Sequence, residues 1–165
     1  MEIRRIRADE GLRLKALRLR ALADSPMAFG STLVREQAYP DALWHERAVY
    51  GAAGDKVVTI VAEHGDHLLG MATGLAPEVE GLPDPMMVGV FVDGAVRQQG
   101  VAAALVEKVI DWARVRGSAR LRIWLTVGNE PALGLYRRAG FRPTGATRPS
   151  AHTPDLMESE MLLEL

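Results

Sequence analysis

The stretch VDGAVRQQGVAAALV, residues 92–106, places Arg97, two glutamines and Gly100 between a strand-like apolar segment and a helix-like one. A helix that begins at Gly100 would present unpaired backbone N–H groups and a partial positive charge at its first turn. Gly100 would let an anion approach the main chain, and Arg97 would add a full positive charge. The stretch therefore predicts a pyrophosphate site built mainly from backbone donors.

A plain surface loop before an alanine-rich helix explains the same residues about as well, because short glycine-containing motifs are weak evidence. The stretch is not a Walker loop, since no Gly-Lys-Ser/Thr follows, and it lacks the further glycines of the dinucleotide fingerprint. The residues after Gly100 are small, as a backbone-built anion site requires.

The elements around this stretch alternate between strand and helix patterns. The apolar run 86–92 predicts a buried strand, residues 100–116 carry apolar side chains at helical spacing, and residues 120–127 predict another strand. Together they are expected to form a right-handed parallel crossover. The segment 129–140 predicts a short helix with Asn129 as its N-cap.

The rest of the chain predicts one α/β domain over residues 1–165, with a mixed sheet and helices on both faces. A weak strand, two helical regions, a hairpin and two final strands are expected at residues 2–7, 8–26, 32–54, 56–75, 141–148 and 157–165. The segment 76–85 is rich in proline and predicts a loop. The last residues, MLLEL, predict an exposed sheet edge that could pair with a second chain, giving a homodimer.

Composition narrows the function classes. The 165 residues are 48% hydrophobic and 25% charged, as in an ordinary globular protein. The formal net charge of −1 and the lack of a basic aromatic platform argue against nucleic acid or an anionic membrane as partner. The absence of cysteine excludes disulfides, thiolate metal sites and a cysteine nucleophile. We see no signal peptide and no apolar run long enough to span a bilayer, so a cytoplasmic location is expected.

Over residues 86–142 the chain resembles the GNAT acetyltransferases. The matching positions agree in identity, order and spacing: Val92, Arg97, Gly100, Ala102, Asn129, Ala132 and the segment Leu135–Phe141. Gly94 stands where the family often has proline, and Val96 where an aromatic residue is common. The resemblance implies a single-domain fold with a mixed, mostly antiparallel sheet and a central parallel crossover.

The resemblance also implies acetyl-CoA as the acyl donor, with no metal. Its pyrophosphate is expected to take N–H groups of Gln98, Gln99, Gly100, Val101, Ala102 and Ala103, with Arg97 forming the loop. Its pantetheine arm is expected to pair like an extra strand with Val90, Phe91 and Val92. Asn129 would bind the pantetheine or order the site, and Ala132 and Tyr136 would adjoin it. Arg137 or Arg138 could meet the adenosine phosphates, although a solvated helix face explains both at least as well.

In this family an acceptor amine attacks the thioester directly, through a tetrahedral intermediate. The backbone N–H of Phe91 is a candidate donor to the oxyanion. Tyr136 matches the tyrosine that protonates the departing thiolate. A core tyrosine whose hydroxyl bonds a main-chain carbonyl is the alternative for Tyr136.

The general base and the acceptor site are harder to place. The strand 86–92 has no carboxylate, which leaves Glu78, Glu80, Asp84, His152 or a water chain as candidates for the base. We expect the acceptor between the first two helices, the 76–85 loop and the 148–156 loop. The aromatic residues that could line it are Phe29, Tyr39 and Trp44, and Trp44 is better explained as hydrophobic core. His45, His64 and His67 lack convincing metal-ligand spacing.

Two functions from different classes remain. The first is an N-acetyltransferase acting on a primary amine of a small molecule, peptide or protein. The second is a non-catalytic acyl-CoA-binding sensor or regulatory module. The missing carboxylate on the strand 86–92 favours the second slightly, and Tyr136 with Asn129 favours the first. We prefer the enzyme.

Overall fold

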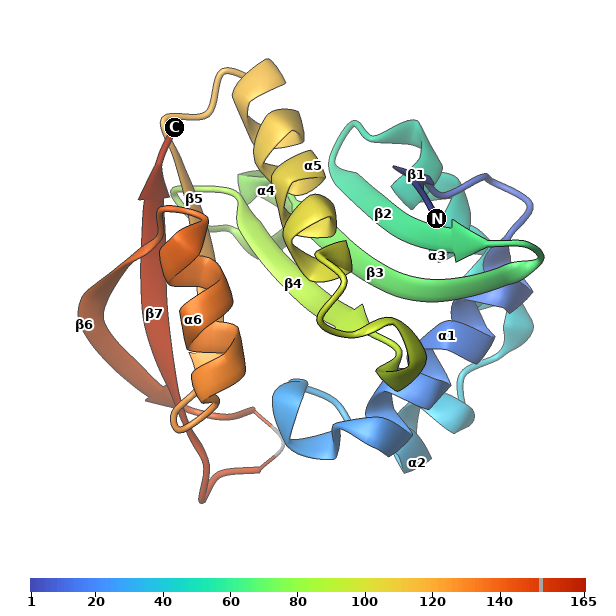
Figure 1. Ribbon diagram of the computed structural model, residues 1–165, viewed down its shortest axis with the longest axis horizontal. Coiled ribbons are helices and arrows are strands. Elements are labelled where there is room, and N and C mark those ends of the chain that lie inside the picture. The colour runs from blue at the N-terminus through green and yellow to red at the C-terminus, as the bar shows by residue number, and fades with distance from the viewer. Residues whose placement is uncertain (152) are drawn as a thin grey trace.

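The computed structural model describes residues 1–151 and 153–165, except for the side chain of residue 80. A seven-stranded sheet runs through the molecule in the order β1-β2-β3-β4-β5-β7-β6 (Figure 1). Neighbouring strands are antiparallel except β4 and β5, which are parallel. The predicted mixed, mostly antiparallel sheet is confirmed. The strands are β1 (Glu2–Arg5), β2 (Val57–His64), β3 (His67–Leu75), β4 (Met86–Val92), β5 (Arg120–Thr126), β6 (Arg142–Pro149) and β7 (Met157–Glu164).

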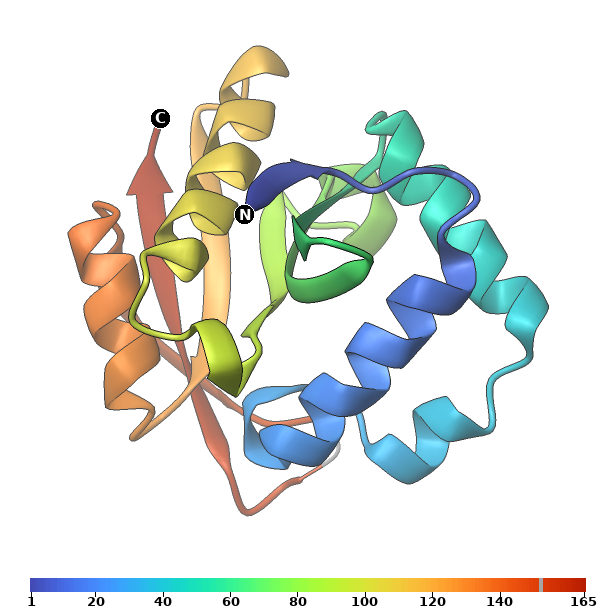
Figure 2. The same ribbon diagram turned by 45° about the vertical axis from the view of Figure 1, so that its right-hand side comes forward.

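Helices cover both faces of the sheet, as predicted. Helices α5 and α6 lie on one face, and α1 and α3 lie on the other (Figures 1 and 2). The helical segments are α1 (Gly11–Asp24), η1 (Pro26–Ala28), α2 (Leu33–Gln37), α3 (Asp41–Ala53), α4 (Pro77–Glu80), η2 (Gly94–Val96), α5 (Val101–Val115) and α6 (Glu130–Arg138).

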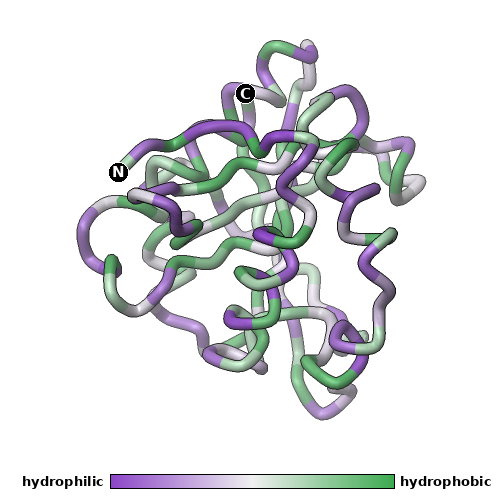
Figure 3. The backbone as a smooth tube through the Cα atoms, turned by 90° about the vertical axis from the view of Figure 1, so that its right-hand side faces the viewer, coloured by the Kyte–Doolittle hydropathy of each residue, from purple (hydrophilic) through white to green (hydrophobic). Residues whose placement is uncertain are grey.

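Each face of the sheet has its own hydrophobic core. On the first face, Leu105 and Val109 of α5 are fully buried against strand residues such as Leu121. On the second face, Leu17 of α1 and Trp44 of α3 are buried. The strands are largely apolar because both faces are covered, and the hydropathy colouring of Figure 3 shows hydrophobic stretches along them.

The two parallel strands part after a short paired segment, and this divergence positions the site. Only Met86 and Met87 of β4 pair with β5, opposite Arg122 and Ile123. Gly89 then adopts a φ of +64°, a left-handed conformation that favours glycine, and the β3–β4 pairing is irregular at the same place. The end of β4 therefore remains paired with β3 and turns its other edge away from β5.

Two details differ from the sequence prediction. The MLLEL segment is not an exposed edge, because β7 is paired with β5 on one side and with β6 on the other. The edge strand on this side of the sheet is β6, whose eight residues are all exposed. The 76–85 segment contains the short helix α4, which proline opens at its first position. Within the described residues, no helix has the length and apolar character needed to cross a membrane.

Candidate functional site

The loop before α5 has the open backbone that an anion site would need. Gly100 is the N-cap of α5 at a φ of +80°, and Gln98 also has a positive φ, +63°. The N–H of Ala104 donates the first helical bond, to the Gly100 carbonyl at 3.1 Å, so the amides before it have no acceptor within the helix. A Cβ added at Gly100 would meet no atom within 4 Å, so the main chain there lies open.

Arg97 is fixed against β4 and does not extend over the helix terminus. Its Nε donates to the Val92 carbonyl at 2.9 Å, and its other guanidinium end is paired with Asp24 of α1. The guanidinium also lies over the Phe91 ring, 5.9 Å from its centroid. Arg97 therefore shapes the loop, while the backbone supplies the donors.

A cavity of about 1080 Å³ extends from this loop along the diverging end of β4 to α6. Gln99 does not line it, since its side chain lies near the Ala95 carbonyl at 3.5 Å. We call this space the loop cavity. Its predicted members are Val90, Phe91, Val92, Arg97, Gln98, Gly100, Val101, Ala102, Ala103, Asn129, Ala132 and Tyr136.

Helix α6 borders the loop cavity and places Asn129 and Tyr136. The Asn129 side chain caps the helix, accepting a hydrogen bond from the Ala132 N–H at 3.3 Å. The Tyr136 ring is 4% exposed and packs edge-on against Phe141, with ring centroids 5.7 Å apart. Arg138 lines the loop cavity, whereas Arg137 does not.

The hydroxyl of Tyr136 is not used by the core. No described residue hydrogen-bonds it, so the alternative in which it bonds a main-chain carbonyl is not what the structure shows. Burial raises the pKa of the phenol well above its usual value, because the phenolate would lose its hydration. Tyr136 is therefore protonated at neutral pH and can donate a proton but not accept one.

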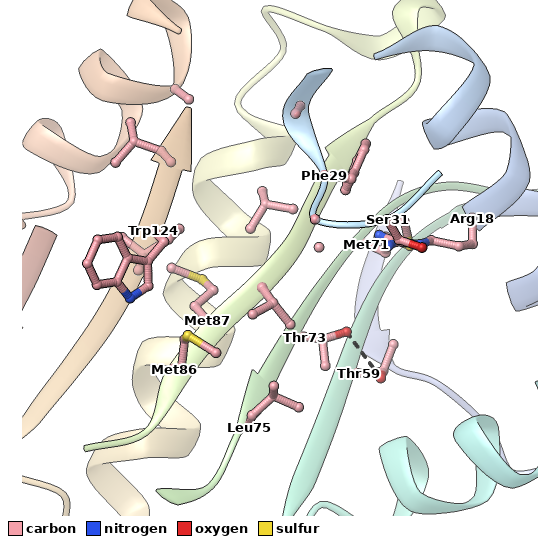
Figure 4. Close-up of a pocket in the computed structure, with 18 of the residues that line it drawn as sticks. Arg18, Phe29, Ser31, Thr59, Met71, Thr73, Leu75, Met86, Met87 and Trp124 are labelled. Atoms are coloured by element: carbon pink, nitrogen blue, oxygen red, sulfur yellow. Dashed lines mark hydrogen bonds between the residues drawn. The ribbon is translucent and has the colours of Figure 1, made fainter. Parts of the chain in front are cut away.

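A second cavity, of about 500 Å³, lies on the other side of β4, under α1 and α3 (Figure 4). We call it the α1 cavity. The two cavities meet where β4 and β5 part, because six residues line both of them: Ala28, Phe29, Val90, Asn129, Ala132 and Tyr136. Molecules placed in the two cavities would therefore be neighbours beside Tyr136.

The wall of the α1 cavity is mostly apolar. Met71, Leu75, Met86, Met87 and Trp124 line it, and Figure 4 shows their side chains around the opening. The hydroxyls of Thr59 and Thr73, 3.4 Å apart, are among the few polar groups on the strands. An acceptor in this cavity would contact thioether and aliphatic groups over most of its surface.

A buried ion cluster carries part of the charge in this wall, and the Arg148–Glu158 pair carries the rest. Glu36 of α2 is 2% exposed and forms ion pairs with Arg18 of α1 at 2.8 Å and with Arg47 of α3 at 3.6 Å. Burial alone would raise the pKa of Glu36, but the hydrogen bonds and charge of Arg18, with Arg47 beside it, lower that pKa below its usual value. Glu36 is thus an ionised, satisfied carboxylate. The sequence analysis missed this cluster.

Glu78 and Asp84, the two candidates for a general base whose side chains are described, line neither cavity. Asp84 pairs with Arg122 at 2.9 Å and Arg120 at 3.2 Å, and Glu78 lies 4.0 Å from Arg116. No described side chain of the segment 76–85 lines either cavity, so the expectation that this loop borders the acceptor is wrong. His152 and the side chain of Glu80 lie outside the described residues.

The aromatic candidates divide between site and core. Phe29 lines both cavities, and Trp44 lines the α1 cavity while being 1% exposed in the core. Tyr39 lines neither and packs on Trp44 at 6.2 Å. Among the described residues, no three histidine or carboxylate side chains are grouped as a metal site would require.

Comparison with known proteins gives a consistent family. The model of the acetyltransferase (GNAT) family matches residues 19–141. An uncharacterized N-acetyltransferase from Methanocaldococcus jannaschii is 38% identical over 52 residues, which cover 32% of this chain and 23% of that protein. The chain therefore spans under a quarter of that relative's length. The ribosomal protein bS18-alanine N-acetyltransferase of Escherichia coli K12 is 26% identical over 79% of this chain and 84% of its own.

Solved structures show the same fold. A Salmonella typhimurium protein, determined with its cofactor acetyl-CoA, superposes with a TM-score of 0.81 at 18% sequence identity. The match covers 100% of this chain and 94% of that one.

Proposed function

The chain belongs to the acetyltransferase (GNAT) family, and we propose that it transfers the acetyl group of acetyl-CoA to a primary amine. The observation that supports this most is the meeting of two cavities beside Tyr136, where β4 and β5 part. The loop cavity suits an acyl donor, and the α1 cavity suits an acceptor. Direct transfer needs the two reactants to touch at one place, and this arrangement supplies one.

The residues of the loop cavity fit acetyl-CoA. The unpaired amides at the start of α5 and the open main chain at Gly100 suit a pyrophosphate. The edge of β4 that turns away from β5, at Val90 to Val92, offers main-chain groups to the amide-containing pantetheine arm. The side chains of Ala102 and Ala103 in the cavity wall are small enough to let a ligand approach the main chain closely.

Each remaining role falls on a group with suitable chemistry. Bound acetyl-CoA supplies the activated acyl carbon. Tyr136, protonated and without a partner among the described residues, donates its proton to the sulfur that leaves.

The Phe91 N–H, the predicted donor to the oxyanion, faces β3, because the Asp93 N–H two residues further on donates to the Leu69 carbonyl of β3 at 2.7 Å. The open edge of β4 instead presents main-chain groups of Val90 and Val92, of which the Val90 N–H is the better candidate to donate to the carbonyl oxygen as negative charge develops there.

The acceptor is a primary amine of a small molecule or of a peptide or protein. The Escherichia coli relative is named for acetylating an alanine of ribosomal protein bS18, which supports an amine acceptor for this chain. We propose that the whole of residues 1–165 acts as one catalytic domain.

The test follows free thiol release from acetyl-CoA with a panel of amines, together with the melting temperature. Acetyl-CoA is expected to raise the melting temperature, because a ligand that binds only the folded state stabilises it. At least one amine is expected to accelerate thiol release. Equal stabilisation by NADH or ATP, or no stabilisation at all, would reject the assignment of the donor.

A sensor without catalysis is the second candidate. It is favoured by the carboxylates of the α1 cavity, because Glu36 and Glu158 are both paired with arginines and β4 itself carries none. Tight acetyl-CoA binding with no thiol release for any amine would support the sensor over the enzyme.

A further inference from the structure

Arg18 lines the α1 cavity and is held there by two kinds of contact. It reaches from α1 toward the cavity (Figure 4), and its guanidinium lies 4.6 Å from the centroid of the Phe29 ring. Its Nε and Nη2 bond Glu36 at distances of 2.8 to 3.2 Å. The guanidinium plane is therefore fixed by a carboxylate on one edge and an aromatic ring on one face.

The other edge of the same guanidinium is unused. An arginine has five N–H groups, and the bonds to Glu36 need only the Nε–H and one Nη2–H. No described residue accepts a hydrogen bond from Nη1. The edge formed by Nη1 and Nη2 can therefore take a second carboxylate in the paired geometry that guanidinium groups favour.

Gly89 makes room for this edge next to the reaction point. A Cβ at Gly89 would stand 3.5 Å from Arg18 Nη1, and no other atom lies within 4 Å of it. Gly89 is at the position where β4 leaves β5, adjacent to Val90, which lines both cavities. The open guanidinium edge thus lies beside the place where donor and acceptor meet.

We propose that the acceptor is a free amino acid, with a carboxylate beside its primary amine, and that Arg18 binds that carboxylate. This inference rests on the proposed acetyltransferase activity and names its substrate class. The rest of the α1 cavity supports an apolar side chain on the acceptor, since Met71, Leu75 and Met87 line the wall.

The charged side chains of the wall favour an acceptor that carries an anionic group as well as its amine over an acceptor that carries only amines. Its charged side chains are Arg18, Arg47 and Arg148 against Glu36 and Glu158, and both carboxylates already have arginine partners. A peptide N-terminus or a polyamine would bring an ammonium with no carboxylate left to receive it. An amino acid brings the missing anion with its amine.

The same contact would help the chemistry. A fixed guanidinium near the acceptor disfavours its ammonium form and lowers the pKa of that amine. The neutral amine is the nucleophile, so Arg18 would increase its fraction in the bound state. This would lessen the need for the carboxylate that β4 lacks.

The first experiment compares L-leucine and L-phenylalanine with their C-terminal amides as acceptors for the purified chain. Each amide keeps the amine and side chain and removes only the carboxylate. We expect kcat/KM to be about tenfold or more higher for the acids, the range for a hydrogen bond to a charged group. The acids should have the higher kcat/KM although a larger fraction of the amine groups of the amides is neutral at neutral pH.

Three variants assign the preference to Arg18. The Arg18→Met/Glu36→Gln double variant removes the guanidinium without stranding a buried carboxylate, and Arg18→Lys keeps the charge but removes the paired geometry. Both should lose most of the acid preference through a higher KM for acids, with KM for amides nearly unchanged. Lys15→Met is the control. It removes one positive charge from the same helix, but Lys15 forms an exposed pair with Asp41 and does not line the α1 cavity.

The outcomes separate this inference from the proposed function. Amides that match or exceed the acids would overturn the inference and leave the acetyltransferase standing. So would an acid preference that survives the double variant, or acetylation confined to peptides and polyamines. If no amine of any kind accelerates thiol release, the proposed function is rejected, and the inference is rejected with it.

Discussion

The loop cavity and the α1 cavity lie on opposite sides of β4 and are built by different means. The loop cavity takes its donors from backbone amides at one strand end and one helix start, within about fifteen consecutive residues. The α1 cavity takes its polar groups from side chains on α1, α2 and α3 and on the strands. A backbone-built site binds a constant ligand whatever the neighbouring side chains are. A site built from side chains can change its ligand by substitution, so we expect the donor to be general and the acceptor to be specific.

Replacing Tyr136 by phenylalanine tests the point where the cavities meet, and should have the largest effect. The ring packing against Phe141 is kept and only the acid is lost. Turnover should fall about a hundredfold or more, while acetyl-CoA affinity changes little. The loss should shrink with an acyl donor whose thiol is more acidic, because such a thiolate leaves without help. Turnover near the parent level in the folded variant would remove Tyr136 from the mechanism.

Replacing Gly100 by valine tests the loop cavity alone. The new side chain would fill the space over the main chain at the start of α5, so acetyl-CoA affinity should fall about tenfold or more. Calorimetric titration and the ligand-induced rise in melting temperature both report it.

The positive φ at Gly100 strains any side chain, so the effect needs a control. Gly117, at the other end of α5, has a φ of +74° and equally open surroundings. Gly117→Val should lower stability similarly and keep acetyl-CoA binding. Equal loss of binding in both variants would show that strain, and not blocked approach, is the cause.

The difference in construction also explains what the sequence could predict. Strand 86–92 leads into Gly100 over a few residues, and Asn129 and Tyr136 belong to one short helix, so local patterns predict these elements. The family resemblance predicts that they lie close together. Asn129 as N-cap and Gly100 at the start of α5 are confirmed. Whether the predicted residues bind acetyl-CoA stays a prediction.

The α1 cavity could not be predicted, because its members come from distant segments. Arg18 alternates with leucines in α1, a pattern that is equally typical of a solvated helix face. Nothing in the sequence around Glu36 indicates that its carboxylate is buried. Their pairing depends on how α1, α2 and α3 pack. The β7 edge was misplaced for the same reason, since only the tertiary fold shows β6 pairing outside it.

Acid titration sharpens the comparison, because carboxyls with lowered pKa occur on the α1 side of the sheet. Hydrogen bonds from Arg4 hold the pKa of Glu10 at about 2 and that of Glu63 at about 2. A carboxyl group whose pKa is lower in the folded state than in the unfolded state, where it is about 4.3, stabilises the fold fully above pH 4.3. This contribution is lost as the pH falls toward 2. The melting temperature should therefore fall steeply between about pH 4.5 and 2.

Replacing Glu10 by glutamine should lower the melting temperature by several degrees at pH 7 and by little near pH 2. Glu10 is 4% exposed and bonds Arg4 at 2.7 and 2.8 Å, so Glu10→Gln removes one of the two carboxylates that neutralise a nearly buried guanidinium and leaves only Glu63. Asp41→Asn, which breaks an exposed ion pair, is the matched control and should change little at either pH. A constant difference between Glu10→Gln and the parent across this pH range would contradict the assignment.

The ion pair between Asp24 and Arg97 joins the two regions, and breaking it should have the smallest effect. Asp24 ends α1, and Arg97 belongs to the loop that would hold the pyrophosphate. Asp24→Asn removes a negative charge near that anion and releases Arg97 toward it. Because the pair is more than one-third exposed on both sides, we expect acetyl-CoA to bind only about two- to fivefold more tightly, with the gain reduced by salt. A weaker affinity would mean that the pair matters mainly as an anchor that keeps Arg97 shaping the loop. Titrating acetyl-CoA at low and high ionic strength separates these two roles, since loss of an anchor would persist in salt and a gain in charge attraction would not.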